Sequence, residues 1–132
     1  MNGLSPKENR TIPPLRYADV WRLKAERPEC IIEINGGIRD HTAIAKHLEH
    51  VDAVMIGRAA YETPFLFAEA DQRYFGSSER PITRHEAVLA MIPYTSRWVD
   101  AGEPIHRITR HMLTLFAGLP GTKAWKRALS TP

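Results

Sequence analysis

Residues 33–40, with the sequence EINGGIRD, decide how the rest of the chain is interpreted. The run CIIEI at 30–34 overlaps this stretch, is dominated by isoleucine and predicts a short buried strand. Asp40 can cap a helix that the pattern predicts over 41–51. The apolar stripe of that helix is formed by Ala43, Ile44, Leu48 and Val51. Two adjacent glycines, Gly36 and Gly37, therefore stand where a strand gives way to a helix.

A second junction of the same kind follows about one strand–helix–strand step later. The run AVMIG at 53–57 predicts another buried strand, which ends in Gly57 and is followed by Arg58. In parallel α/β folds the chemistry lies at the carboxyl ends of the strands. Glycine lets backbone N–H groups approach an oxyanion, a following helix N-terminus adds positive charge, and arginine can add a bidentate clamp. A phosphate cradle is thus predicted from Asn35, Gly36, Gly37, Gly57 and Arg58. The alternative is two tight turns that bind no ligand.

The order of elements predicts an α/β fold followed by an all-α part. A helix over 15–27 ends at Pro28, and the two strands then alternate with helices, the last of them at 65–75. After 76–82 three helical patterns follow without a strand, at 83–101, 105–117 and 122–129. Since two strands cannot close a barrel that needs eight, we expect the last two βα units of a (β/α)8 TIM barrel in residues 1–75. A C-terminal helical domain is expected in residues 76–132.

The composition of the chain indicates which class of partner it binds and in which compartment it is found. The chain has 132 residues and a net charge of +3. From residue 105 to the end there are five cations and no acid: Arg107, Arg110, Lys123, Lys126 and Arg127. Such a tail favours a polyanion, nucleic acid before membrane, although a solvated helical face is the alternative. No apolar run is long enough for a bilayer, which predicts a cytoplasmic protein.

The titratable side chains outside the glycine junctions give little sign of chemistry. Cys30 is the only cysteine, so a disulfide framework is excluded, and we expect it to be buried on the strand rather than to act as a nucleophile. His47 and His50 lie three apart on one predicted helix. No acidic or cysteine partner has ligand spacing to them, so no metal site is expected.

Several motifs together resemble the tRNA-dihydrouridine synthases, and within them the A type. The motifs are GLSPKENRTIPPL at 3–15, INGGI at 34–38, VMIGRAAYETP at 54–64, FGSS at 75–78 and ITRHMLTLFAGLPGTKAWKR at 108–127. The resemblance implies an FMN-bearing barrel followed by a helical tRNA-binding domain. It also implies that NADPH reduces the flavin, which passes a hydride to a D-loop uridine and gives 5,6-dihydrouridine, while a cysteine supplies the other proton.

The resemblance assigns roles to individual residues. Asn35, Gly36 and Gly37 match the flavin-phosphate loop after the seventh strand of the family's barrel. Gly57 and Arg58 match the loop after the eighth strand. The tRNA-contacting positions of the family match Lys7, Arg10, Lys123 and Lys126.

The resemblance also predicts what this chain lacks. The family's catalytic cysteine belongs to a strand upstream of Met1, and Cys30 does not match it. We therefore expect a carboxy-terminal fragment, monomeric and inactive alone, without a catalytic residue of its own. Two other hypotheses remain open at this stage: a stand-alone RNA-binding module, and the end of another phosphate-binding barrel enzyme.

Overall fold

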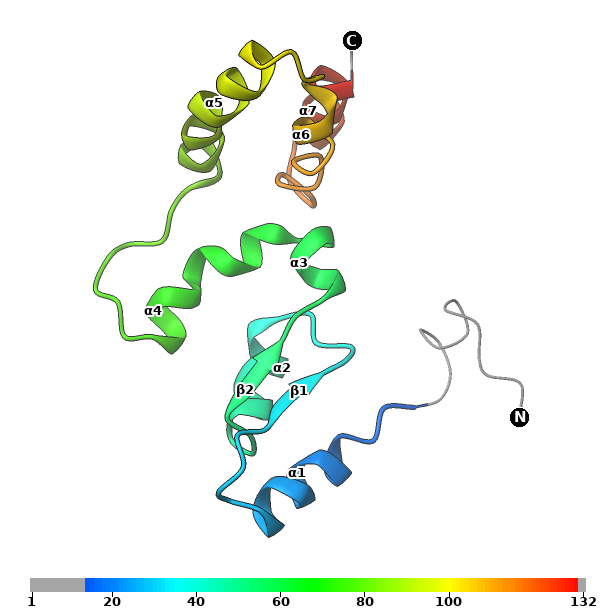
Figure 1. The fold of residues 1–132 in the computed structure, drawn as a ribbon, viewed down its shortest axis with the longest axis vertical. Coiled ribbons are helices and arrows are strands. Elements are labelled where there is room, and N and C mark those ends of the chain that lie inside the picture. Colours follow the sequence, from blue (N-terminus) through cyan, green and yellow to red (C-terminus); the bar gives the residue numbers. More distant parts are fainter. Residues whose placement is uncertain (1–13, 131–132) are drawn as a thin grey trace. The chain divides into compact units, whose positions relative to one another are not determined.

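The computed structural model describes residues 14–130, and their contacts divide into two compact units (Figure 1). One unit ends at Gly57 and the other begins at Arg58, and each is described by itself. The first contains α1 (Tyr17–Glu26), β1 (Glu33–Asn35), α2 (His41–Leu48) and β2 (Ala53–Met55). The second contains α3 (Arg58–Glu62), the 3-10 helix η2 (Pro64–Glu69), α4 (Ala70–Tyr74), α5 (Arg84–Asp100), α6 (His106–Thr109) and α7 (Thr122–Ser130).

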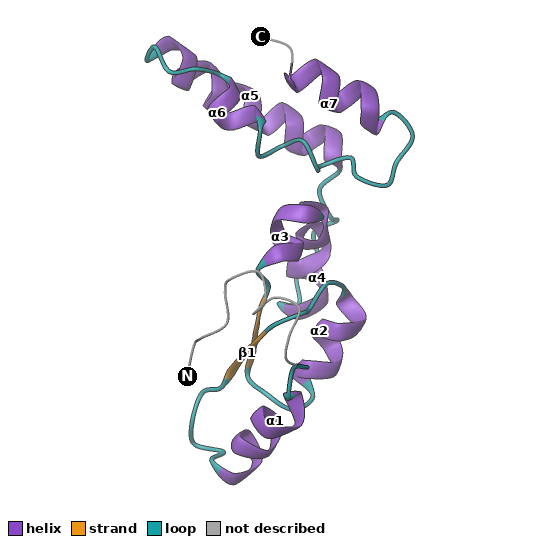
Figure 2. Cartoon of the chain, turned by 90° about the vertical axis from the view of Figure 1, so that its right-hand side faces the viewer, coloured by secondary structure: helices purple, strands orange, loops and turns teal. Residues whose placement is uncertain are grey.

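The sheet of the first unit consists of β1 and β2, which run parallel (Figures 1 and 2). Glu33 pairs with Ala53, and Asn35 pairs with Met55 at the other end. The helix α2 connects the two strands and contacts β2. The carboxyl ends of both strands therefore lie at the same edge of the sheet, as the sequence predicted for a parallel βα arrangement.

The core of this unit is small. Its buried apolar residues are Ile34, Ile38, Ile44 and Val51. Asp40 caps α2, because its carboxylate accepts a hydrogen bond of 2.8 Å from the N–H of Ala43. Leu48, expected on the apolar stripe, is exposed, whereas the ring of His47 is buried in its place.

The predicted strand at 30–34 begins only at Glu33, and the prediction that Cys30 is buried was wrong. Cys30 is exposed, and Ile31 is 87% exposed. The backbone before Ile32 takes part in the end of α1 instead of a ladder, since the Cys30 N–H donates to the carbonyl of Arg27 at 3.1 Å. The Cys30 carbonyl accepts from the Nζ of Lys24 at 2.7 Å. Because the N–H and carbonyl of Cys30 are used in this turn, Cys30 does not pair with β2.

The second unit begins with α3, a short helix that was not predicted from the sequence. The helix predicted at 65–75 is split between η2 and α4. Among the described residues no helix is both long and apolar enough to cross a bilayer.

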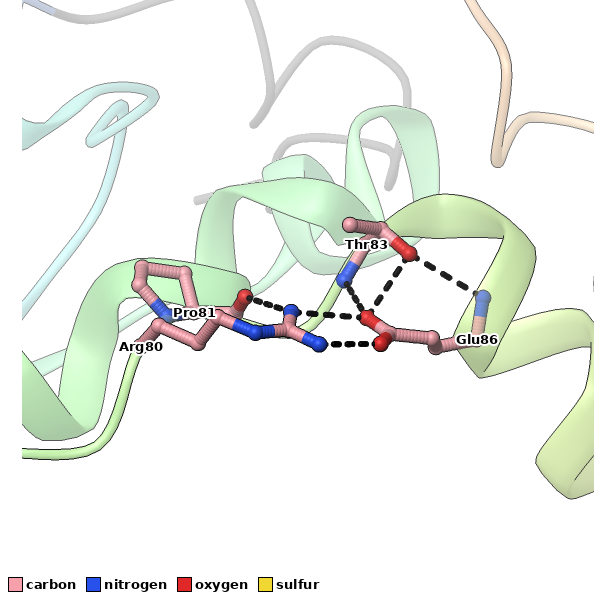
Figure 3. A network of polar contacts seen from close by, with 4 residues as sticks. All are labelled: Arg80, Pro81, Thr83 and Glu86. Atoms are coloured by element: carbon pink, nitrogen blue, oxygen red, sulfur yellow. Dashed lines mark hydrogen bonds and ion pairs between the residues drawn. The ribbon is translucent and has the colours of Figure 1, made fainter.

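The helix α5 starts at a capping box formed by Thr83 and Glu86, which the S/T-x-x-E spacing of these residues indicates (Figure 3). The Thr83 hydroxyl accepts from the Glu86 N–H at 3.2 Å, and the Glu86 carboxylate accepts from the Thr83 N–H at 2.8 Å. Both oxygens of the same carboxylate also accept from the guanidinium of Arg80. These hydrogen bonds, that of Arg80 first, hold the pKa of Glu86 well below its usual range.

The prediction of a helix over 105–117 was wrong beyond Thr109, where α6 ends. After α6 the chain continues in tight turns, in which the N–H groups of His111, Met112, Leu115 and Ala117 bond to carbonyls three residues back. Distant side chains take the carbonyls that a longer helix would use. Trp125 Nε1 donates to the Met112 carbonyl, and Arg84 Nε donates to the Leu115 carbonyl, both at 2.9 Å. The last helix, α7, forms as predicted and contacts α6.

Candidate flavin-phosphate site and basic surface

The loop after β1 is shaped by its two glycines. Gly36 has a φ of 121° and Gly37 a φ of 66°, both rarely adopted by other L residues. The phenol of Tyr17 donates to the Gly36 carbonyl at 2.6 Å. A Cβ on Gly37 would lie 2.9 Å from Tyr17 Oη and 3.0 Å from Leu15 Cδ1. Conformation and packing against the start of α1 thus account for both glycines without a ligand.

A cluster of rings holds Tyr17 beneath this loop. The rings of Tyr17 and His47 meet edge to face with centroids 4.4 Å apart. Trp21 Nε1 donates to His47 Nδ1 at 3.2 Å. Burial first, then the charges of Lys46 and His50, lowers the pKa of His47. This packing role of His47 was not predicted, although His47 follows Ile44 by three residues on α2 and therefore lies on the buried face of that helix.

Gly57, after β2, differs from the first two glycines. Its φ is not positive, and a Cβ added there would meet no atom of residues 14–130 within 4 Å. No packing inside this unit therefore demands a glycine, and the open space leaves the backbone accessible to a ligand. Because Asn35 pairs with Met55, Gly36 and Gly57 follow neighbouring strand ends.

Arg58 is the first residue of α3 and is exposed. Within residues 14–130 no carboxylate forms an ion pair with it. Its guanidinium therefore keeps its donors for a phosphate or another anion.

The basic side chains from residue 105 onward differ in whether a carboxylate neutralises them. Arg107 is neutralised by Glu103, with a contact of 2.6 Å between Nη1 and Oε2. Lys123 and Lys126 are exposed on α7, and no ion pair holds either of them within the described part of the chain. Trp125 lies between them in sequence and is bound to the Met112 carbonyl, so it serves packing. Lys7 and Arg10, the other predicted tRNA contacts, lie outside the described residues.

No metal centre is formed by the residues that the structure describes, since no three His, Cys, Asp or Glu side chains come together among them. His47 uses its Nδ1 to accept the hydrogen bond from Trp21.

Comparison with known proteins shows to which family the chain belongs. The family model described as dihydrouridine synthase (Dus) matches residues 3–131. The chain belongs to the dihydrouridine synthase family. This membership confirms the resemblance that the five motifs indicated.

Individual dihydrouridine synthases are close in sequence. A tRNA-dihydrouridine(20/20a) synthase of Synechocystis sp. is 52% identical over 130 residues, which cover 98% of this chain and 39% of that protein. Proteins with the same name from Shewanella oneidensis and Escherichia coli K12 are each 47% identical over 130 residues, covering 39% and 38% of their lengths. The chain thus spans about two fifths of the length of these relatives.

Proposed function

We propose that this chain carries the flavin-phosphate end and part of the tRNA-binding surface of a tRNA-dihydrouridine synthase. The complete enzyme is an FMN-dependent oxidoreductase that uses NADPH to reduce D-loop uridines to 5,6-dihydrouridine. Its βα part is the end of a TIM barrel, and residues 76–132 are its helical tRNA-binding domain. The observation that carries the proposal is the family match over residues 3–131, combined with two glycine junctions at neighbouring strand ends.

Within this proposal, Asn35, Gly36, Gly37, Gly57 and Arg58 hold the phosphate of FMN. The bound flavin would supply the hydride chemistry, and these residues would fix it by its phosphate end. The open backbone at Gly57 fits an anionic oxygen ligand, and so does the exposed guanidinium of Arg58, which forms no ion pair within residues 14–130. The two glycines after β1 give weaker support, because their conformation has its own explanation.

Riboflavin, which lacks the phosphate, provides the test of this site. In the complete synthase, Arg58→Ala should weaken FMN binding by about 10- to 150-fold, the worth of a hydrogen bond to a charged group of about 1.5–3 kcal/mol. Riboflavin binding, followed by flavin fluorescence, should stay as in the unchanged enzyme. An equal loss for both ligands would show that Arg58 acts on folding or on the ring system, and no loss for either would remove it from the site.

The proposed tRNA surface in the described residues is formed by Lys123 and Lys126. Replacing both with glutamine should weaken tRNA binding and lower the steepness of its salt dependence by about one to two units in a log–log plot. Arg107→Gln is the matched control, because Glu103 already neutralises that guanidinium. If the control and the double variant behave alike, the lysines do not form a specific contact surface.

A second candidate function is an RNA-binding module that holds no flavin. The packing of Gly36 and Gly37 against Leu15 and Tyr17 favours it, because the loop needs no ligand to explain its glycines. It predicts the same loss of tRNA affinity in the lysine variant. It differs in predicting that FMN does not bind the complete protein at all.

A further inference from the structure

Three side chains of the second unit, from distant parts of the sequence, form one polar cluster at its surface. Tyr61 belongs to α3, while Arg110 and His111 directly follow α6. Tyr61 Oη and His111 Nδ1 are 3.1 Å apart, and their rings meet edge to face with centroids 5.7 Å apart. The Thr114 hydroxyl donates to the Tyr61 backbone carbonyl at 2.7 Å. The turns after α6 are thereby fixed to α3 at two points.

The donors and acceptors of the cluster can be assigned from chemistry alone. Arg110 Nε–H can only donate, and it points at His111 Nε2 at 3.1 Å. Nε2 must therefore present its lone pair, and the neutral ring carries its hydrogen on Nδ1. Nδ1 then donates to the oxygen of Tyr61, so the phenol hydrogen of Tyr61 remains to be donated outward. The imidazole thus orients two donors, one on each side.

The cluster offers mainly hydrogen-bond donors to solvent. Within the part of the chain that the structure describes, four of the five N–H groups of Arg110 remain after the bond to His111. Arg110 is exposed, Tyr61 is 55% exposed, and no ion pair involves Arg110 within residues 14–130. From residue 105 onward the sequence contains no acid.

We propose that Tyr61, Arg110 and His111 bind one backbone phosphate of the RNA, with His111 as the positioning residue between two donors. A guanidinium fork and a phenol O–H, both oriented by the same imidazole, supply the charged and neutral donors that anionic phosphate oxygens accept. The inference rests on the proposed function, because it takes RNA as the partner. The RNA would then be contacted by a residue of α3, the helix that begins with Arg58, in addition to the lysines of α7.

The test of this inference is the affinity of the complete synthase for tRNA. It is measured by fluorescence anisotropy over a series of salt concentrations. Tyr61→Phe keeps the ring and removes one neutral donor, so binding should weaken by about tenfold with an unchanged salt slope. Arg110→Gln should weaken binding and also lower the slope by about one unit. The controls are Tyr94→Phe, another exposed tyrosine, and Arg107→Gln, the paired arginine three residues earlier.

The outcomes separate this inference from the proposed function. If the unchanged protein binds no tRNA, the proposed function fails first. If it binds tRNA and only the lysine variant is weakened, while Tyr61→Phe and Arg110→Gln bind normally, the phosphate contact is refuted. Inorganic phosphate, titrated as a competitor, distinguishes the source of the ligand. Loss of phosphate binding in the two variants with unchanged tRNA affinity would identify a small-anion site and overturn the assignment to RNA.

Discussion

Replacing Gly37 with alanine should lower the free energy of unfolding by about 2–3 kcal/mol. A φ of 66° costs an L residue about 1–2 kcal/mol. The new methyl group would lie 2.9 Å from Tyr17 Oη, closer than van der Waals contact allows. If Tyr17 moves away, its hydrogen bond to the Gly36 carbonyl is lost, which adds about 1 kcal/mol.

Gly57→Ala is the matched control for this prediction. Its backbone needs no positive φ, and a methyl group there would touch none of the residues that the structure describes. Stability should therefore stay within about 0.5 kcal/mol of the unchanged protein. FMN binding should nevertheless weaken, if the phosphate needs close approach to this backbone.

Urea unfolding followed by far-UV circular dichroism compares the variants directly. At an unchanged slope, the midpoint should fall clearly for Gly37→Ala and stay nearly constant for Gly57→Ala. Equal shifts for the two variants, or a Gly37→Ala protein as stable as the original, would refute the argument from φ and the Tyr17 contact.

Three further predictions concern stability. Thr83→Ala removes the N-cap of α5 and should cost about 1 kcal/mol in urea unfolding, while Thr83→Ser should not; equal losses would contradict the capping argument. Because burial lowers the pKa of His47 below the ordinary 6.5, the folded state favours the neutral ring. Stability should therefore be complete above that value and fall as the pH drops through it, and His47→Asn should flatten this dependence. The pKa of Asp52 is lowered by hydrogen bonds from the Ile32 N–H and Lys24, so its contribution should be present at neutral pH and disappear in acid. Asp52→Asn should remove this loss, and an unchanged acid transition would show that another carboxylate is responsible.

Features that depend on neighbours in sequence could be predicted from the sequence. The cap of Asp40 on Ala43 and the capping box of Thr83 and Glu86 each span three residues, so the pattern specifies both partners. The glycine junctions follow in the same way from a strand that is succeeded by a helix.

Features that depend on distant partners could not be predicted. The start of β1 is decided by its pairing with residues twenty positions later, which left Cys30 outside the strand. The turns after Thr109 depend on Trp125 and Arg84, and neither is visible in the local periodicity. In the candidate site, the glycines were predicted, whereas the support by Tyr17 from nineteen residues away was not.

The exposed position of Cys30 makes this chain easy to label. Cys30 is the only cysteine in the sequence, and it lies in the turn before β1, while the glycine loop follows β1. A maleimide dye would therefore attach at a single position, at the amino end of the sheet and away from the proposed phosphate site. The same accessible thiol allows two molecules to couple through a disulfide in air, so a reducing agent belongs in every buffer used before labelling.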